Sequence, residues 1–199
     1  REGKHVVIVT PTASGKSLCY TLPVVAGAMS RQAKALYLFP TKALAQDQVA
    51  ELLELNRAGK LGLKAFTFDG DTPGDARQAI RLHGDIVVSN PDMLHQAILP
   101  HHTKWAQFFE NLQYVVIDEI HTYRGVFGSH VANVLRRLRR ICRFYGADPQ
   151  FILCSATIGN PQAHASRMLG RDVACVGESG APVGERRVVV YNPPVVNPE

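Results

Sequence analysis

Short runs of apolar residues alternate with longer amphipathic stretches along most of the chain. The short runs are rich in Val, Ile and Leu, which is typical of strands buried on both faces. Between them, apolar side chains recur at helical spacing, as at Leu44, Val49, Leu52 and Leu53. Because such strands alternate with helices, the pattern predicts an α/β fold with a mostly parallel central sheet and helices on both faces.

Turn residues and changes of period set the expected limits of each element. Strands are expected at residues 5–10, 35–39, 63–68, 85–89, 114–117, 151–154, 172–176 and 187–191. Helices are expected at residues 16–29, 42–56, 74–83, 105–111, 128–145 and 161–169, and one more is expected to start at Pro91. Residues 1–191 are therefore interpreted as one domain, and the proline-rich residues 192–199 as an exit linker toward a second domain outside the sequence.

The composition is that of an ordinary globular domain. Hydrophobic residues make up 46% of the chain and charged residues 20%. No apolar run approaches the ~18 residues that a membrane-spanning helix needs, so no membrane partner is expected. The net charge of +5 favours a polyanionic partner. The chain starts at Arg1 and not at methionine, so we expect it to be a segment of a longer protein.

The cysteines show no metal-binding pattern. Cys19, Cys142, Cys154 and Cys175 form no C-x-x-C pair and have no histidine at ligand spacing. They are expected to be reduced packing residues of a cytosolic protein, without a zinc site.

The first strand leads into TPTASGKS at residues 10–17, and a helix follows. In a phosphate-binding loop, backbone N–H groups and the helix N-terminus face the phosphates, the lysine reaches the outer phosphates and the hydroxyl ligates Mg²⁺. Thr10 and Ala13 stand where such loops commonly carry glycine, so the alternative is a chance loop containing Gly-Lys-Ser. Its place between a strand and a helix favours the nucleotide site. The expected contacts are Thr12, Ala13, Ser14, Gly15, Lys16 and Ser17.

Two adjacent carboxylates, Asp118 and Glu119, follow the strand at residues 114–117. Such a pair resists burial unless a cation or a reaction needs both charges. With the phosphate loop upstream, Asp118 is expected to hold Mg²⁺, partly through water, and Glu119 to activate the attacking water. Lys16 completes the expected catalytic set. The alternative is an acidic strand end in an ordinary loop.

The segments TASGKS, PTKALAQDQ, NPDMLH, DEIH and SAT each follow a strand-like run, in this order. Together they resemble the first motor domain of superfamily-2 DExH-box helicases. The longer segments FDGDTP, DEIHTYRGVFGSHVANVLRRLRRIC and GAPVGERRVVVYNPP resemble one branch, which contains the bacterial mitomycin repair helicase and its eukaryotic RecQ-like relatives. The resemblance implies a RecA-like P-loop NTPase domain of an ATP-dependent 3′-to-5′ DNA helicase in repair, in the bacterial cytoplasm at the nucleoid.

By the same resemblance, two strand ends contact the phosphates of the nucleic acid. Thr41 and Lys42 follow the second strand, and Asn90, Pro91 and Asp92 follow the fourth. A hydroxyl or amide, a cation and a helix N-terminus suit a phosphate group. The alternative is helix capping by Thr41 and Asn90, and the two roles are compatible.

His121, Ser155 and Thr157 match the positions that couple the nucleotide site to the nucleic acid and to the second motor domain. His121 lies two residues after the second acid, within reach of the magnesium site. For the two hydroxyl residues, the alternative is a local hydrogen bond to the backbone.

A basic amphipathic helix is expected after the acidic pair. Its apolar stripe consists of Val131, Val134, Leu135, Leu138 and Ile141. Its cations lie largely outside the stripe and are Arg136, Arg137, Arg139, Arg140 and Arg143. These arginines either contact nucleic acid or another domain, or form a solvated face.

The resemblance also implies the partners and cofactors. The cofactors are ATP and Mg²⁺, and the partners are DNA, as a single strand or a 3′-tailed duplex, and a second RecA-like domain of the same chain. An arginine finger from that domain is worth ~10³-fold or more in rate, so the 199 residues alone are expected to have little ATPase activity. Two alternatives stay open. One is an RNA-directed DExH helicase, because no motif here reads a 2′-OH, and the other is a non-unwinding translocase or ATP switch.

Overall fold

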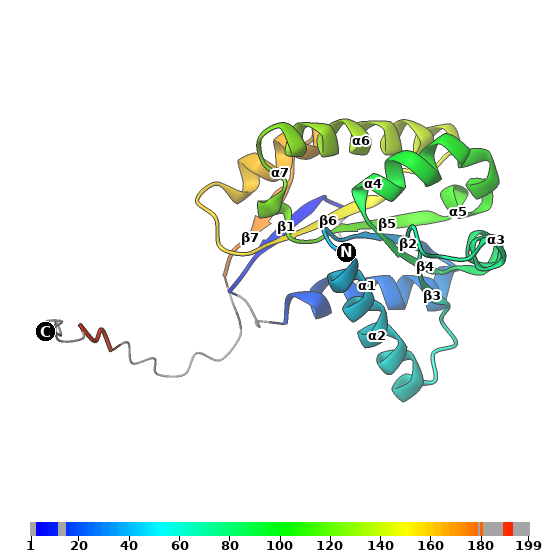
Figure 1. Cartoon of the computed structure of the whole chain (residues 1–199), viewed down its shortest axis with the longest axis horizontal. Helices are drawn as coiled ribbons and strands as arrows, with labels where there is room; N and C mark the ends of the chain where they lie inside the picture. Colours follow the sequence, from blue (N-terminus) through cyan, green and yellow to red (C-terminus); the bar gives the residue numbers. More distant parts are fainter. Residues whose placement is uncertain (1–2, 12–14, 179, 181–188, 193–199) are drawn as a thin grey trace, which may run out of the picture.

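The strands of the chain form one parallel sheet in the computed structural model, which describes residues 3–11, 15–178, 180 and 189–192 (Figure 1). Over these residues the sheet has seven strands, in the order β3-β4-β2-β5-β6-β1-β7. Every strand pair in the described part of the chain is parallel. The strands are β1 (Val6–Val9), β2 (Lys34–Leu38), β3 (Ala65–Thr67), β4 (Ile86–Ser89), β5 (Leu112–Ile117), β6 (Gln150–Ser155) and β7 (Ala174–Val176).

The helices connect consecutive strands, as parallel pairing requires. They are α1 (Lys16–Arg31), α2 (Lys42–Gly59), α3 (Gly74–His83), α4 (Pro91–Met93), α5 (Ala106–Glu110), α6 (Gly125–Phe144) and α7 (Pro161–Leu169). Three irregular turns of helix complete the connections: η1 (Leu94–Ile98), η2 (Leu99–Trp105) and η3 (Ile120–Thr122). In the described part of the chain, no helix is both long enough and apolar enough to cross a membrane.

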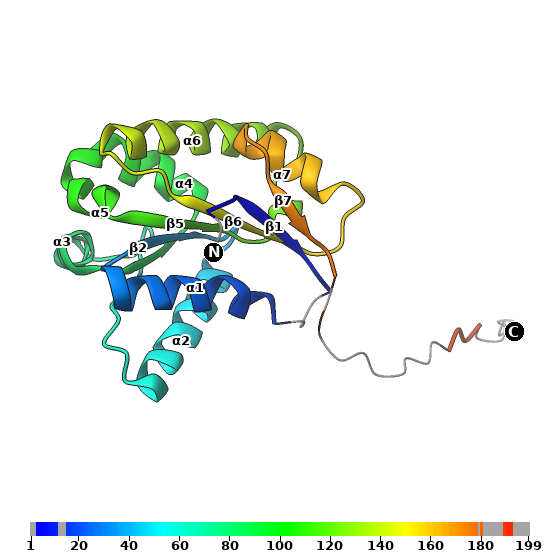
Figure 2. The same cartoon turned by 180° about the vertical axis from the view of Figure 1, so that it is seen from behind.

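Two apolar layers cover the sheet, one on each face. Helices α1 and α2 lie on one face, and α4, α5, α6 and α7 lie on the other (Figures 1 and 2). Because successive side chains of a strand point to opposite faces, β2 places Leu36 and Leu38 in the layer under α6 and Ala35 and Tyr37 in the layer over α1. The predicted α/β fold with helices on both faces is therefore confirmed.

Most predicted elements are confirmed, with limits shifted by a few residues. The strand predicted at residues 187–191 is wrong where the structure describes it. Val189, Val190 and Tyr191 form no strand, and they are 86%, 89% and 75% exposed. The segment continues into Asn-Pro-Pro, and proline cannot donate to a sheet ladder. Residues 187–188 and 193–199 lie outside the described residues, so the domain limit at residue 191 and the linker at 192–199 stay predictions.

The packing prediction for the cysteines is right for two of the four. Cys142 and Cys154 are buried free thiols, and burial raises the pKa of Cys142 to about 12. Cys19 and Cys175 are free but exposed, which corrects the prediction for these two. Cys19 lies on the outward side of α1, and Cys175 lies on the edge strand β7, where no layer covers it.

Helix α6 buries the predicted apolar stripe. Val131, Leu135 and Leu138 are buried against the sheet, and Val134 and Ile141 pack at the margin of the same layer. The arginines are intermediate or exposed. One of them, Arg139, has a structural role, because its Nη1 donates to the carbonyl oxygen of Leu169 at the end of α7 at 2.7 Å.

The turn between the acidic pair and α6 depends on a close approach at Gly128. A β-carbon at this position would overlap the backbone carbonyl group of Tyr123. Because backbone atoms yield less than a side-chain tip, Gly128→Ala is expected to destabilise the fold by about 1–3 kcal/mol, measured by urea unfolding. Gly74→Ala is the matched control, because nothing lies within 4 Å of its β-carbon. It is expected to be neutral or stabilising by up to about 1 kcal/mol. Wild-type stability of Gly128→Ala would contradict the close approach.

Candidate functional site

Strand register brings the predicted motifs to one edge of the sheet. Leu38 at the end of β2 pairs with Ile117 of β5 and with Ser89 of β4. Val9 at the end of β1 pairs with Ser155 at the end of β6. Each motif begins directly after one of these strand ends, and the carboxyl edge of an open parallel sheet is where ligands bind.

Gly15 of the phosphate-binding loop is the N-cap residue of α1, directly before its first residue, Lys16. Gly15 has φ +77° and ψ 26°, a left-handed conformation that glycine adopts without steric penalty. The Lys16 ammonium donates to the carbonyl oxygens of Thr10 at 2.8 Å and Pro11 at 3.1 Å. It therefore lies at the carboxyl end of β1, beside the loop. Thr12, Ala13 and Ser14 lie outside the described residues, so their part in the site stays a prediction.

Asp118 lies where β5 ends. Its N–H donates to the carbonyl oxygen of Leu38 at 3.0 Å, and its Oδ1 accepts from the N–H of Glu119 at 2.7 Å. Burial raises the pKa of Asp118; the charge of Glu119 adds to this, and the hydrogen bond from the Glu119 N–H opposes it. The nearby positive charge of Lys16 compensates for the burial only in part, since the pKa is still raised, and a divalent cation would compensate further.

A chain of hydrogen bonds connects the phosphate loop with Asp118. Ser17 Oγ donates to Glu51 Oε1 at 3.2 Å, and Gln48 Nε2 donates to Glu51 Oε2 at 3.1 Å. The Tyr20 hydroxyl donates to Gln48 Oε1 at 2.7 Å and lies 3.3 Å from Asp118 Oδ2. The two predicted magnesium contacts, Ser17 and Asp118, are thus held by one network that runs through α1 and α2.

The sequence patterns do not assign Tyr20, Gln48 or Glu51 to the site. One signal for Gln48 is a polar residue on the buried face of an amphipathic helix, where it is only 6% exposed. Burial, followed by the charge of Asp118, raises the pKa of Tyr20 far above its ordinary value. The phenol therefore stays protonated and remains a donor.

His121 connects the acidic pair with the segment after β6. Its Nε2 lies 3.1 Å from Glu119 Oε2, and its Nδ1 accepts from the N–H of Ala156 at 3.3 Å. The acceptor role of Nδ1 assigns the proton to Nε2, which donates to Glu119. Glu119 has φ +54°, a left-handed conformation that costs a residue with a β-carbon about 1–2 kcal/mol. The structure therefore brings Glu119 and His121 into contact with the segment that carries Ser155 and Thr157.

The two hydroxyl residues after β6 differ in their surroundings. Ser155 is fully buried, and its Oγ has no hydrogen-bond partner among the described residues. Thr157 is exposed. Local capping of the backbone by Ser155 Oγ is therefore absent over the described residues.

The predicted nucleic-acid residues at the ends of β2 and β4 cap helices. Thr41 Oγ1 accepts from the N–H of Leu44 at 3.3 Å, and Asn90 Oδ1 accepts from the N–H of Met93 at 2.8 Å. Pro91 is buried at the first position of α4, and Asp92 next to it is exposed. The capping alternative is confirmed for Thr41 and Asn90, and it leaves these helix N-termini at the surface of the same sheet edge.

Lys42 has a carboxylate partner that the motif does not predict. Its Nζ donates to Asp71 Oδ2 at 2.6 Å, and both side chains are largely exposed. Asp71 sits on a braced turn, because its N–H donates to Asp69 Oδ1 at 2.9 Å. The Arg77 guanidinium donates to the carbonyl oxygens of Thr72 at 2.9 Å and Asp69 at 3.0 Å. Asp71 thus competes with any phosphate for Lys42.

The donors at the acidic pair fit a shared magnesium ion. Within the described ranges, no group of three His, Cys, Asp or Glu side chains could hold a metal by itself. Ser17 and Asp118 offer oxygen donors, which Mg²⁺ prefers, and Mg²⁺ usually completes its shell with water and substrate phosphates. The site therefore fits a metal that arrives with a nucleotide.

A phosphate-binding loop after β1 and an acidic pair after β5, both at the carboxyl edge of a parallel sheet, define a RecA-like P-loop nucleotide-binding domain. Within that class, the sequence model of the DEAD/DEAH box helicases matches residues 1–165. The chain belongs to the DEAD/DEAH box helicase family.

Known relatives are similar over nearly the whole chain. It is 60% identical over 198 residues to the uncharacterized ATP-dependent helicase YprA of Bacillus subtilis (strain 168), in an alignment that covers 99% of this chain and 26% of YprA. It is 44% identical over 202 residues to the ATP-dependent helicase hrq1 of Schizosaccharomyces pombe, in an alignment that covers 99% of this chain and 19% of hrq1. The crystal structure of the DUF1998 helicase MrfA bound to DNA and AMPPNP matches with a TM-score of 0.94 at 60% identity, covering 98% of this chain and 28% of MrfA. The predicted resemblance is confirmed, and the chain spans about a quarter or less of these proteins.

Replacement of Asp118 tests the burial of its charge. Because the folded-state pKa is raised, wild-type stability falls as pH rises from the ordinary carboxyl pKa through the raised value, and it stays lower at neutral pH. The Asp118→Asn chain does not lose stability in this way, because its side chain carries no charge. Without nucleotide, calorimetry at pH 7 is expected to show an unfolding midpoint about 2–4 °C above wild type, with no advantage near pH ~3.

Asp75→Asn is the matched control, because this carboxylate is exposed in the first turn of α3. It is expected to leave the midpoint unchanged. An Asp118→Asn chain less stable than wild type at pH 7 would show that the hydrogen bonds of Asp118 outweigh its burial.

Proposed function

We propose that the chain is the ATP-binding motor domain of an ATP-dependent 3′-to-5′ DNA helicase that acts in DNA repair. The observation that carries this proposal is the hydrogen-bonded connection of three motifs. Ser17 is connected to Asp118, and Glu119 is connected through His121 to the N–H of Ala156. A motor needs such a connection, because hydrolysis at one site must change the grip at another.

In this proposal each site residue has a definite task. The backbone of residues 12–15 and the Lys16 ammonium hold the triphosphate. Ser17 and Asp118 would hold Mg²⁺, Asp118 partly through water, and the metal would supply positive charge that offsets the charge of the phosphates. Glu119 orients the attacking water and accepts its proton. His121, bonded to both Glu119 and the Ala156 N–H, transmits the change to Ser155 and Thr157.

Turnover in this proposal needs a second RecA-like domain. The relatives named above are about four times longer than the aligned chain or more, which leaves room for such a domain in a longer protein. Phosphoryl transfer in related motors depends on an arginine finger, worth ~10³-fold or more in rate. The chain then supplies one half of the catalytic cleft.

The proposed nucleic-acid partner is DNA, as a single strand or a 3′-tailed duplex, gripped by Thr41, Lys42 and the Asn90–Asp92 turn. The 60%-identical MrfA is bound to DNA in its crystal structure, which favours DNA over RNA as the partner here. We propose a bacterial cytoplasmic location at the nucleoid, because a motor that acts on DNA meets its substrate there.

Nucleotide binding and turnover test the ATP site separately. Lys16→Ala is expected to weaken binding of a magnesium-bound fluorescent ATP analogue by about tenfold or more, because a charge-assisted contact is lost. Lys104→Ala, an exposed lysine on η2, is the control and should bind as wild type. The isolated chain is expected to hydrolyse ATP at close to the background rate. Robust DNA-stimulated turnover by these residues alone would contradict the need for a second domain.

In a protein that contains this chain and a second motor domain, Glu119→Gln is expected to keep nucleotide binding and to lose strand displacement on a 3′-tailed duplex. Wild-type protein that hydrolyses ATP but displaces no strand would point instead to a translocase or switch.

The Lys42–Asp71 pair gives two substitutions with opposite expected signs. Lys42→Ala is expected to weaken single-stranded DNA binding about fivefold at ~0.1 M salt, because one phosphate contact is lost. Asp71→Asn removes the competing carboxylate and is expected to strengthen binding about twofold to fivefold. Asp75→Asn removes a nearby exposed charge that does not contact Lys42, so it is the control. Fluorescence anisotropy with DNA, and with RNA of the same sequence as competitor, measures both affinity and preference. Equal affinities for Asp71→Asn and Asp75→Asn would show that Asp71 does not compete, and wild-type affinity of Lys42→Ala would remove Lys42 from the phosphate path.

A further inference from the structure

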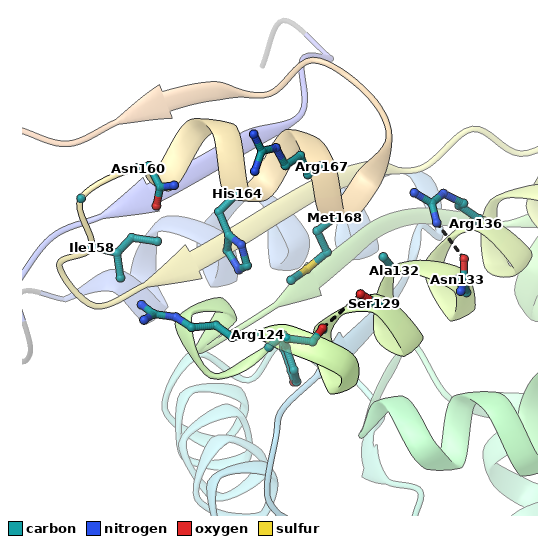
Figure 3. Close-up of a pocket in the computed structure, with 14 residues that line it drawn as sticks. Arg124, Ser129, Ala132, Asn133, Arg136, Ile158, Asn160, His164, Arg167 and Met168 are labelled. Atoms are coloured by element: carbon teal, nitrogen blue, oxygen red, sulfur yellow. Dashed lines mark hydrogen bonds between the residues drawn. The ribbon is translucent and has the colours of Figure 1, made fainter.

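A hollow of about 650 Å³ lies between α6 and α7 at the carboxyl edge of the sheet (Figure 3). The start of α6, the loop after β6 and one side of α7 form its walls. We name it the α6–α7 hollow. Arg124 and Arg136 from the α6 side and Arg167 from α7 line it, and no carboxylate is among its lining residues in the described part of the chain.

The cations of this hollow are free to bind a ligand. Arg136 donates to Asn133 Oδ1 at 2.7 Å. Arg124 and Arg167 are exposed and make no ion pair among the described residues. A wall of guanidinium groups without acids creates a positive potential, and it attracts planar oxyanions that accept two hydrogen bonds at once.

The neighbouring helix face carries the same sign of charge. Burial lowers the pKa of Arg139; the charges of Arg171, Arg143 and Arg136 lower it further, and the charge of Asp148 opposes them. The cations therefore outnumber the acids on this side of α6 and α7.

A second hollow, of about 440 Å³, lies on the other side of α6, against α4. We name it the α4–α6 hollow. Asn133 lines both hollows, so the two meet across α6. Arg137 and Arg140 line the second hollow together with Pro91 and Asp92, which belong to the turn proposed to grip DNA.

We propose that the α6–α7 hollow binds phosphate groups of a DNA strand that passes from the Asn90–Asp92 turn across α6, with Arg124 and Arg167 as the phosphate ligands. The inference rests on the proposed function and extends it to a surface outside the motifs. Guanidinium groups from two walls suit a sugar–phosphate backbone, which they hold without reading its sequence.

The arrangement favours a linear polyanion over a compact one. Basic side chains line hollows on both sides of α6, and Asn133 belongs to both, whereas a small polyphosphate would fill one closed pocket. The phosphate loop for a nucleotide follows β1, and β6 lies between β1 and β5 in the sheet. A strand of repeated phosphates matches a row of cations that continues from one hollow into the next.

The α6–α7 hollow also contacts segments that belong to the nucleotide site. Ile158 and Asn160 line the hollow, and they lie one and three residues after Thr157. His164 lines it from α7, and its Nε2 donates to the carbonyl oxygen of Ile120 at 2.9 Å. Ile120 lies between Glu119 and His121. A phosphate group in the hollow therefore lies next to both segments that report on hydrolysis.

Fluorescence anisotropy with a labelled single-stranded oligothymidine tests the inference over a range of salt concentrations. Arg124→Gln and Arg167→Gln are each expected to lower the affinity of the chain about fivefold at ~0.1 M salt. Each is also expected to reduce the slope of log K against log salt by about 0.7, the value for one phosphate contact on a single strand. Arg124→Lys and Arg167→Lys keep the charge and should keep most of the slope. Arg143→Gln is the matched control, because it removes an exposed arginine of α6 that lines neither hollow.

The outcomes separate this inference from the proposed function. A wild-type chain that does not bind DNA would contradict the proposed function itself. If the wild type binds and Lys42→Ala weakens binding, but Arg124→Gln and Arg167→Gln behave as Arg143→Gln, the inference is wrong and the proposed function stands. Unchanged DNA affinity and slope, together with reduced DNA-stimulated hydrolysis in a protein with a second motor domain, would also overturn it, because the hollow would then bind a protein segment.

Discussion

Parallel pairing of β1, β2, β5 and β6 is the constraint on which the site depends. Since every strand runs the same way, every strand-to-helix turn falls at the same edge, and residues distant in sequence meet there. The sheet is covered by an apolar layer on both faces. A strand that slid along its neighbours would therefore expose apolar residues at one end and bury the polar residues that flank it at the other. Ser155, the last residue of β6, and Asp118, which directly follows β5, are therefore positioned by the core.

The second constraint is electrostatic. Two adjacent acids at a buried strand end need donors. The Glu119 N–H donates to Asp118 Oδ1 and His121 Nε2 donates to Glu119 Oε2, whereas the Tyr20 hydroxyl, which donates to Gln48, lies 3.3 Å from Asp118 Oδ2. A hydrogen bond to a charged acceptor is worth about 1.5–3 kcal/mol, which offsets the burial of Asp118 only in part, because the pKa of its carboxyl group is still raised. The raised pKa means that a nearby cation would stabilise the carboxylate, and the network that ends at Ser17 connects the two side chains proposed to hold magnesium.

The fold follows from the sequence because its strands are short apolar runs, several of them rich in Val, Ile and Leu, a pattern typical of parallel strands covered on both faces. The phosphate loop and the acidic pair follow from it as well, since their residue types have few other uses at those positions. The Tyr20–Gln48–Glu51 connection does not, because it depends on how α1 and α2 are rotated against the sheet. The pairing of Lys42 with Asp71 also depends on tertiary structure, since a separate turn braced by Arg77 presents the carboxylate. The strand predicted at residues 187–191 is absent at residues 189–191, because β propensity alone does not form a strand when no neighbouring strand pairs with it.

The nucleotide-loop contacts and the basic hollows lie on opposite faces of the sheet, and a few hydrogen bonds at its carboxyl edge connect them. Phosphate-loop contacts extend to α1 and α2 on one face, whereas the basic hollows lie between helices of the other. Between them, His121 bonds Glu119 to the segment after β6, and His164 bonds α7 to Ile120. Ser155 lies at this junction, fully buried, with a hydroxyl that has no partner among the described residues. An unsatisfied buried hydroxyl costs about 1–3 kcal/mol. A rearrangement that gives the Ser155 hydroxyl a partner would regain this free energy.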